Sequence, residues 1–211
     1  MLQASGVREV FLTPSQKKSS PKSAEEKNAL LKLRETVLRC TKCEELAATR
    51  KTVVFGSGNP EAKLLFVGEA PGAEEDRQGL PFVGAAGQLL TKMIEAIGYK
   101  REEVFIANVL KCRPPGNRTP KPLEIENCSP YLVQLISLIR PKLICALGTF
   151  AAQTLLKTGV PISSLRGRTH TYEGIPVICT FHPAYLLRNP PEKRKAWEDL
   201  KKVKAILETD G

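Results

Sequence analysis

The stretch Leu64-Leu65-Phe66-Val67-Gly68-Glu69-Ala70-Pro71-Gly72 joins a short apolar run to a turn of glycine and proline that carries one carboxylate. A second apolar run, Val177–Phe181, ends in the same way at His182-Pro183. Short apolar runs of this kind are typical of buried strands, and parallel α/β sheets place their chemistry just outside the carboxyl ends of their strands. If both strands belong to one sheet, Glu69 and His182 meet at a single cleft. That pairing predicts a hydrolytic site.

Strand-like and helical stretches alternate along the chain. The strand-like runs are Leu64–Val67, Val104–Val109, Leu143–Leu147 and Val177–Phe181. This alternation predicts an α/β fold with a mainly parallel sheet of about four strands and helices on both faces. Residues 1–23, rich in Ser, Lys and Pro, are expected to form a flexible basic leader. Residues 24–211 are expected to form a single domain that is a monomer.

Positive charge predominates, with 32 Lys and Arg against 22 Asp and Glu and a net charge of +10. Such a balance favours an anionic partner, most commonly nucleic acid; a merely basic surface is the alternative. No apolar run approaches the ~20 residues of a membrane span, and the N-terminal residues lack the layout of a signal peptide. We therefore expect no membrane association and a cytoplasmic location.

The six cysteines divide into two groups by their surroundings. Cys145 and Cys179 lie inside strand-like runs and are expected to be small buried hydrophobic residues. Another four lie beside turn-forming or charged residues: Cys40, Cys43, Cys112 and Cys128. Only the first two of these have a strong metal-ligand spacing, and both a four-thiolate zinc site and a [4Fe-4S] cluster fit the set. Local redox pairing of Cys40 with Cys43 is the alternative.

Further candidates for the cleft are an aromatic ring, an amide and a second carboxylate. Phe82 is a candidate stacking platform for a base, a contact worth about 1–3 kcal/mol, with core packing as the alternative. Asn108 lies near the end of an apolar run, so its amide either reads the edge of a ligand or bonds a neighbouring loop. Glu74, Glu75 and Asp76 are expected to form a solvated helix start, with Asp76 kept as a second candidate carboxylate.

Two segments are candidates for contact with nucleic acid. Leu186, Leu187 and Arg188 follow the histidine, and exposed leucines beside an arginine suit insertion into a base stack while the cation holds a phosphate. An ordinary turn into the last helix is the alternative. The Pro-rich residues 113–120 must form a loop, and we expect its Arg113 and Arg118 to follow phosphates.

Five stretches, in this order, resemble the motifs of the family 4 uracil-DNA glycosylases, the iron–sulfur class of the uracil-DNA glycosylase superfamily. They are residues 67–72 (VGEAPG), 80–84 (LPFVG), 108–115 (NVLKCRPP), 146–148 (ALG) and 181–189 (FHPAYLLRN). The resemblance runs from about Cys40 to Leu207. It implies a three-layer α/β/α sandwich and hydrolysis of the N-glycosidic bond of uracil in single- or double-stranded DNA, after base flipping and with an abasic site as product.

The resemblance also implies roles for individual residues. Phe82 would stack on the flipped uracil, Asn108 would pair with its polar edge, and His182 would bond its O2. The tip 186–188 would fill the gap left in the duplex. The cysteines would hold a [4Fe-4S] cluster with a structural role; its implied ligands are Cys40, Cys43, Cys112 and Cys128.

The resemblance identifies the residue that would orient the attacking water less directly. The best-known uracil-DNA glycosylases carry Gln followed by Asp in the first motif, where this chain has Glu69-Ala70, as is usual in family 4. We expect Glu69 to orient the water, with Asp76 as the second candidate, and Ala70 to line the base pocket. Two other functions stay open: a glycosylase of broader specificity for deaminated or mismatched bases, and a non-catalytic iron–sulfur module that binds nucleic acid.

Overall fold

The computed structural model describes residues 23–209, so the expected leader lies almost wholly outside the described residues. Its centre is one sheet of six strands in the order β1-β3-β2-β4-β6-β5. The strands are β1 (Ser57–Gly58), β2 (Leu64–Gly68), β3 (Phe105–Asn108), β4 (Leu143–Leu147), β5 (Thr169–Tyr172) and β6 (Ile175–Thr180). Ser23 is the N-cap of the first helix, where its side chain accepts a hydrogen bond from the Glu26 amide.

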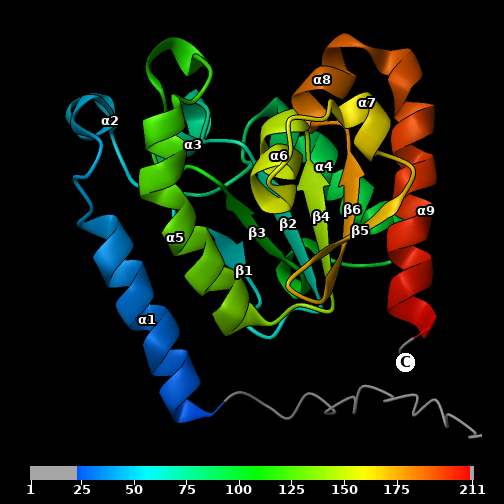
Figure 1. Ribbon diagram of the computed structural model, residues 1–211, viewed down its shortest axis with the longest axis horizontal. Coiled ribbons are helices and arrows are strands. Elements are labelled where there is room, and N and C mark those ends of the chain that lie inside the picture. The colour runs from blue at the N-terminus through cyan, green and yellow to red at the C-terminus, as the bar shows by residue number, and fades with distance from the viewer. Residues whose placement is uncertain (1–22, 210–211) are drawn as a thin grey trace, which may run out of the picture.

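The four central strands are parallel and match the four predicted runs. β3, β2, β4 and β6 pair in parallel, with Gly68 opposite Asn108 and Leu147 opposite Thr180. Their carboxyl ends therefore meet at one edge of the sheet, as Figure 1 shows. The expected number of about four strands is too low, because β1 and β5 add antiparallel edges. Neither edge strand has an apolar run that could reveal it: β1 has two residues, and β5 buries one of its four residues, Tyr172.

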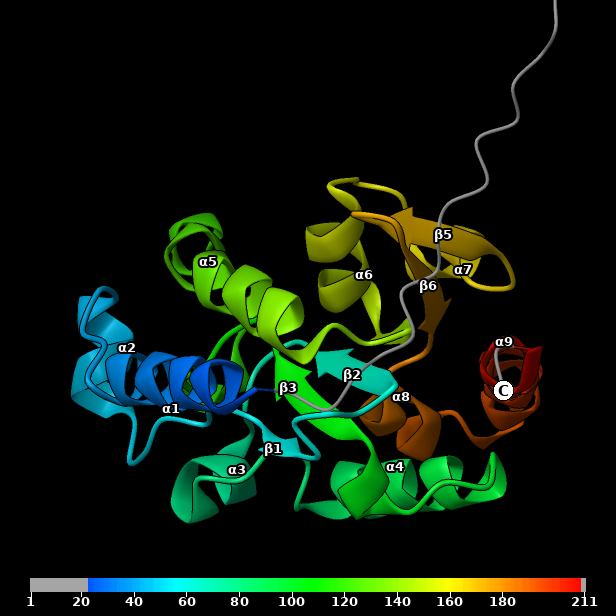
Figure 2. The same ribbon diagram turned by 90° about the horizontal axis from the view of Figure 1, so that it is seen from below.

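Helices cover both faces of the sheet, which confirms the three-layer prediction (Figure 2). Side chains of β2 alternate between the two faces, so Leu65 and Val67 belong to one core and Leu64 and Phe66 to the other. The first core is covered by α1 (Ala24–Leu38), α5 (Pro122–Ile139) and α6 (Thr149–Leu156). The second is covered by α4 (Ala85–Ala96), α8 (Pro183–Arg188) and α9 (Lys193–Thr209).

Shorter elements connect these layers. They are α2 (Glu44–Thr49), α3 (Ala73–Gln78), α7 (Ile162–Leu165) and the 3-10 turns η1 (Arg101–Glu103), η2 (Pro115–Asn117) and η3 (Pro190–Glu192). Within residues 23–209 no helix is both long and apolar enough to span a bilayer.

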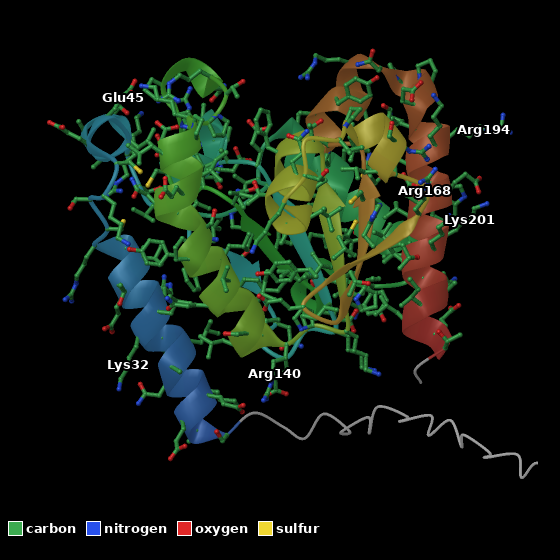
Figure 3. The ribbon with its side chains drawn as sticks, viewed as in Figure 1. Lys32, Glu45, Arg140, Arg168, Arg194 and Lys201 are labelled. Atoms are coloured by element: carbon green, nitrogen blue, oxygen red, sulfur yellow. The ribbon has the colours of Figure 1, made fainter. Side chains whose placement is uncertain are left out.

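Basic side chains are spread over several elements of the surface. Figure 3 shows Lys32 on α1, Arg140 at the end of α5, and Arg168, Arg194 and Lys201 on the side of the molecule that α9 covers. The basic side chains labelled in Figure 3 thus lie on several elements. The net charge therefore does not locate a functional site, which must be found from individual side chains.

Candidate active site and cysteine cavity

One cavity lies at the carboxyl ends of the central strands. It has a volume of about 360 Å³, within the range of small-molecule sites, about 300–1,000 Å³. Five residues expected at the cleft line it together: Glu69, Ala70, Phe82, Asn108 and His182. An acid, an amide, a ring and an imidazole from distant parts of the sequence therefore share one chamber.

Glu69 follows β2 directly and is the carboxylate without a partner. Its main-chain oxygen accepts a hydrogen bond from the Leu110 amide, which fixes the turn against the end of β3. In the part of the chain that the structure describes, its carboxylate makes no hydrogen bond or ion pair. Burial raises the pKa of this carboxyl group above its ordinary value. A half-buried carboxylate with free oxygens can bind a water molecule or face a developing positive charge.

Asn108 is the last residue of β3 and is almost completely buried. Its Oδ1 has no hydrogen-bond partner, the one such side-chain atom found among the described residues. A Cβ on the neighbouring Gly68 would lie 2.4 Å from that oxygen and 2.6 Å from the Phe82 ring. Glycine is therefore required at the end of β2, because the amide and the ring close over its main chain. An unpaired buried oxygen costs about 1–3 kcal/mol, which a ligand N–H would recover.

Phe82 presents its ring to the cavity from a strained loop. Its φ of 52° lies in the left-handed region that non-glycine residues rarely adopt, so surrounding contacts must hold it there. The ring centroid lies 5.5 Å from that of His182, with an interplanar angle of 31°. The aromatic ring and the imidazole thus form adjacent walls of the chamber.

Glu75 holds the Phe82 loop in place, a role that sequence reasoning missed. Its Oε1 accepts hydrogen bonds from the amides of Val83 (2.8 Å) and Gly84 (3.0 Å), and its Oε2 from the amide of Gly72 (3.1 Å). The expected solvated helix start is therefore wrong for this residue, which lines the cavity. The available signal was its place three residues after the N-cap of α3, where a Glu reaches back to a free amide.

His182 is the N-cap of α8, and its ring is oriented by the start of that helix. The Ala184 amide donates to Nδ1 at 3.1 Å, so the neutral ring carries its proton on Nε2. Burial, and next the positive charge of Arg188, lower the pKa of His182 to about 4. The site therefore offers a neutral imidazole whose Nε2–H is a hydrogen-bond donor.

Two residues expected at the site lie elsewhere. The Asp76 carboxylate accepts hydrogen bonds from the amides of Lys51 (2.9 Å) and Thr52 (3.1 Å), and Asp76 is not part of the cavity wall. Leu186 is 1% exposed and packs in the core beneath α8, so it is not available to enter a base stack. Leu187 is 42% exposed and is the apolar side chain that remains at this tip.

The three arginines expected to contact phosphates differ in their surroundings: within residues 23–209, two are bound by neighbouring side chains and one is not. Arg118 lines the cavity, but Glu124 binds its guanidinium through both oxygens at 2.6 and 3.0 Å, and Glu45 contacts it at 3.0 Å. Arg113 donates to Oδ1 of Asn117 at 2.8 Å, and that asparagine, which sequence reasoning did not single out, also lines the cavity. Among the described residues that line the cavity, Arg188 is an exposed cation without an ion pair, so it is available to a phosphate.

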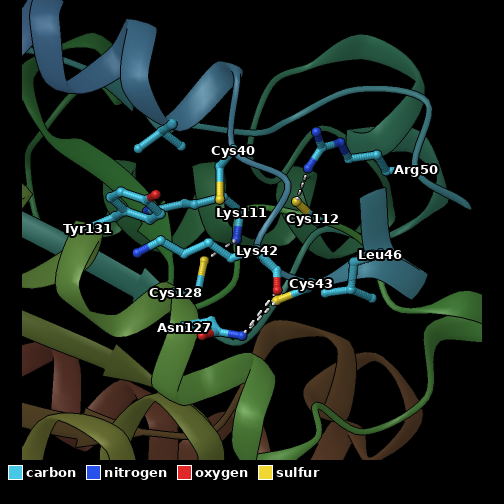
Figure 4. Close-up of a pocket in the computed structure, with 11 residues that line it drawn as sticks. Cys40, Lys42, Cys43, Leu46, Arg50, Lys111, Cys112, Asn127, Cys128 and Tyr131 are labelled. Carbon is cyan, nitrogen blue, oxygen red and sulfur yellow. Dashed lines mark hydrogen bonds between the residues drawn. The ribbon is translucent and has the colours of Figure 1, made fainter. Parts of the chain in front are cut away.

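The four cysteines that were set apart as candidate metal ligands surround a second, smaller cavity (Figure 4). Cys40, Cys43, Cys112 and Cys128 all line it. Three N–H groups point at their sulfurs: Arg50 to Cys112 at 3.0 Å, the Lys111 amide to Cys128 at 3.3 Å, and Asn127 to Cys43 at 3.7 Å.

In the described part of the chain, no group of three or more His, Cys, Asp or Glu side chains is arranged to hold a metal ion. The four thiols nevertheless line a single cavity. Cys145 and Cys179 are completely buried in the sheet, which confirms their expected role as core residues.

Comparison with known proteins adds an independent observation. The family model of the uracil DNA glycosylase superfamily matches residues 55–201, which include both strand-end motifs and the loops between them. The chain belongs to this superfamily. It is 45% identical to the type-4 uracil-DNA glycosylase of Archaeoglobus fulgidus over 175 residues, covering 79% of this chain and 87% of that protein. It is also 45% identical to the type-4 enzymes of Sulfurisphaera tokodaii (86% of each chain) and Thermotoga maritima (84% of this chain, 94% of that protein). These relatives confirm the resemblance to family 4.

Proposed function

We propose that this protein removes uracil from DNA by hydrolysing the N-glycosidic bond of a flipped deoxyuridine, and so begins repair of the deaminated base. One observation carries the proposal: a free carboxylate, an unpaired amide oxygen, an aromatic ring and a neutral imidazole line the same cavity. The base must leave the duplex before it reaches such a pocket, at a cost of a few kcal/mol. The names of the relatives give the same substrate.

The base would be held on three sides. Phe82 stacks on its face, and the Asn108 amide complements its edge, because Oδ1 accepts from uracil N3–H while Nδ2 donates to O4. Cytosine presents the opposite pattern at these positions, so the same amide selects against it. His182 donates from Nε2 to O2, where negative charge develops as the base departs. One preorganised donor of this kind is typically worth about 10²–10³ in rate.

Glu69 would act on the sugar side of the same bond. The C1′–N1 bond breaks with its electron pair staying on uracil, and the oxygen of a water molecule bonds to C1′. Glu69 orients that water, can accept its proton, and stabilises the positive charge that builds on the sugar. Arg188 lines the cavity and suits a flanking phosphate, and the exposed Leu187 beside it in the chain suits the gap left in the base stack.

The activity itself is tested with oligonucleotides that carry a single lesion. The purified protein should release uracil from single- and double-stranded substrates, with alkaline cleavage reporting the abasic product. Comparable activity on hypoxanthine, xanthine or mismatched thymine would instead identify a glycosylase of broader specificity. Binding to all of these substrates without release of any base would identify a non-catalytic module.

Glu69→Gln should lower the single-turnover rate of uracil release and remove the acid limb of its pH profile. The ionised carboxylate is the active form in this mechanism, so activity should be lost as pH falls through its raised pKa. Glu74→Gln is the matched control, because Glu74 lies on the adjacent helix, is exposed and pairs with Arg77. An unchanged rate and profile in Glu69→Gln would remove this residue from the mechanism; Asp76 does not offer a replacement from its buried position.

We further propose that Cys40, Cys43, Cys112 and Cys128 hold a [4Fe-4S] cluster. The donor set fits, since four thiols surround one cavity and three N–H groups face their sulfurs, as is common around iron–sulfur ligands. A cluster would cross-link the end of α1, the start of α2, the loop after β3 and α5. Its contribution is structural in this proposal, and no step of the hydrolysis passes through it.

Iron content and colour test this assignment. Protein purified without oxygen should be brown and hold about four iron atoms per chain, and Cys128→Ser should lower both the iron content and the melting temperature. Cys145→Ala removes a cysteine that is completely buried in the sheet and should leave the iron content unchanged. Colourless protein with a stoichiometric zinc content would contradict the cluster.

We also propose that the protein is a monomer and that it is located in the cytoplasm. The absence of a long apolar run in the sequence supports the location, and gel filtration of the purified protein tests the monomer directly.

A further inference from the structure

Lys111 is a buried cation that the proposed mechanism does not use. It is 1% exposed, the only lysine so deeply buried in the described part of the chain. Its side chain lines the cysteine cavity beside Cys112 and Cys128 (Figure 4). Among residues 23–209 no carboxylate forms an ion pair with it. A buried charge is costly unless it is paired or fully hydrogen-bonded, so this position calls for an explanation.

The contacts of Lys111 reach both the cysteine cavity and the base pocket. Its Nζ donates to the main-chain oxygen of Asn108 at 2.8 Å, and its amide donates to Sγ of Cys128 at 3.3 Å. Its own main-chain oxygen accepts from the Val54 amide at 2.8 Å, and its ammonium lies 6.0 Å from the centre of the Phe55 ring. One residue thus connects the sulfurs to the residue whose amide faces the base.

The hydrogen bond from Lys111 matters to Asn108 because, among the described residues, Oδ1 of the Asn108 side chain has no hydrogen bond that would fix its orientation. Oδ1 makes no hydrogen bond in the described structure, so the direction of the amide is fixed by packing and by the position of the main chain. The amide and the Phe82 ring both lie close over Gly68. The hydrogen bond from Nζ of Lys111 to the Asn108 carbonyl holds the main chain where the strand ends. Misplacement of a recognition group by about 1 Å can cost 10²-fold in rate.

We propose that Lys111 is a positioning residue of the base pocket, set between the cysteine ligands and Asn108 so that it holds the Asn108 main chain in the orientation that reads uracil. Metal-bound cysteines are thiolates, and their negative charge compensates the buried ammonium. The ammonium of Lys111 therefore stabilises the thiolate form of the cysteines, and its hydrogen bond to the Asn108 main chain aligns the Asn108 side-chain amide. The inference rests on the proposed function, since it assigns uracil recognition to Asn108.

Lys111→Met tests the inference against a matched variant of the same cavity, Arg50→Met. Arg50 also lines the cysteine cavity and donates to Cys112 at 3.0 Å, but it has no hydrogen bond to a residue of the base pocket in the described chain. Both variants should hold less iron, by metal analysis and visible absorbance. Comparisons are then made at equal iron content.

Inhibition by free uracil is the readout that separates positioning from mere stability. In Lys111→Met the inhibition constant for uracil should rise by up to about 100-fold, the scale expected when a recognition group is misplaced by about 1 Å, while affinity for undamaged DNA is retained. Arg50→Met should keep the wild-type inhibition constant. Equal uracil affinity in the two variants would overturn the inference. Absence of uracil release by the wild type would instead overturn the proposed function.

Hydrogen exchange of the wild-type protein keeps the test decisive if Lys111→Met does not fold. Removal of iron by oxidation and chelation should increase amide exchange at residues 108–111 more than in β4, at the centre of the same sheet. Exchange that stays the same at residues 108–111 while it rises around Cys40 and Cys43 would overturn the connection.

Discussion

His182→Ala is expected to slow the single-turnover release of uracil by about 10²–10³-fold, the usual effect of removing one preorganised donor to a developing oxyanion. The ring is held for this task before substrate arrives: the Ala184 amide occupies Nδ1, so Nε2 carries the donated proton. Affinity for DNA should change little, because the lost bond matters chiefly as negative charge develops on the base.

His170→Ala is the matched control, since the chain has only two histidines. His170 lies on the edge strand β5, where its Nε2 contacts the main-chain oxygen of Leu165 at 2.7 Å. Its replacement should leave the single-turnover rate close to that of the wild type. Equal losses in both variants would mean that the effect at His182 arises from general destabilisation.

The dependence of stability on pH gives a second readout of the same residue. The pKa of His182 in the fold is about 4, below its ordinary 6.5, chiefly because of burial. Between these values the unfolded chain binds a proton that the folded chain excludes, so the free energy of unfolding should fall as pH falls from 6.5 through about 4. His182→Ala should flatten that decline. An unchanged decline would show that this ring is not the buried neutral imidazole of the site.

Much of the fold follows from the local sequence, because buried parallel strands are continuous apolar runs. β2, β3, β4 and β6 are each buried along most of their length, and each was visible as such a run. β5 was not visible, because its two threonines are exposed, its histidine is only half-buried, and its pairing partner is a later strand. An edge strand of this kind is defined by long-range pairing, which a single sequence does not display.

The same distinction applies to the site. Glu69 and His182 could be predicted because each follows a strand, and parallel strands bring their carboxyl ends together. The role of Glu75 depends on amides eight and nine residues away in the chain, so no local pattern reveals it beyond a capping position. Leu186 was misplaced for a related reason: which face of the short helix α8 packs inward is decided by α4 and the core beneath it.

Asn108→Leu is expected to lower kcat/KM for uracil release by about 10²–10⁴-fold. Leucine has a similar shape but can neither accept from N3–H nor donate to O4. Each polar group of the base left unpaired in a buried pocket costs about 1–3 kcal/mol, and each 1.4 kcal/mol is a factor of ten in rate. Single-turnover rates on a uracil-containing oligonucleotide measure the loss.

The free energy of unfolding of Asn108→Leu should not fall together with its activity. Oδ1 of Asn108 is buried without a partner, so the free protein bears the cost of a group that becomes satisfied only when the base is bound. Leucine removes that unpaired oxygen, and the free energy of unfolding of Asn108→Leu should equal or exceed that of the wild type.

Thr180→Val provides the contrast at the end of a neighbouring strand. The Thr180 hydroxyl donates to Oδ2 of the buried Asp199 at 2.9 Å, and Thr180 is not part of the cavity wall. Its replacement should lower stability, since it withdraws a hydrogen bond from a buried carboxylate, while uracil release is largely retained. If Asn108→Leu proved to be the less stable variant and still released uracil at the wild-type rate, its amide would be a structural group of β3, and recognition of the base would have to come from another wall of the cavity.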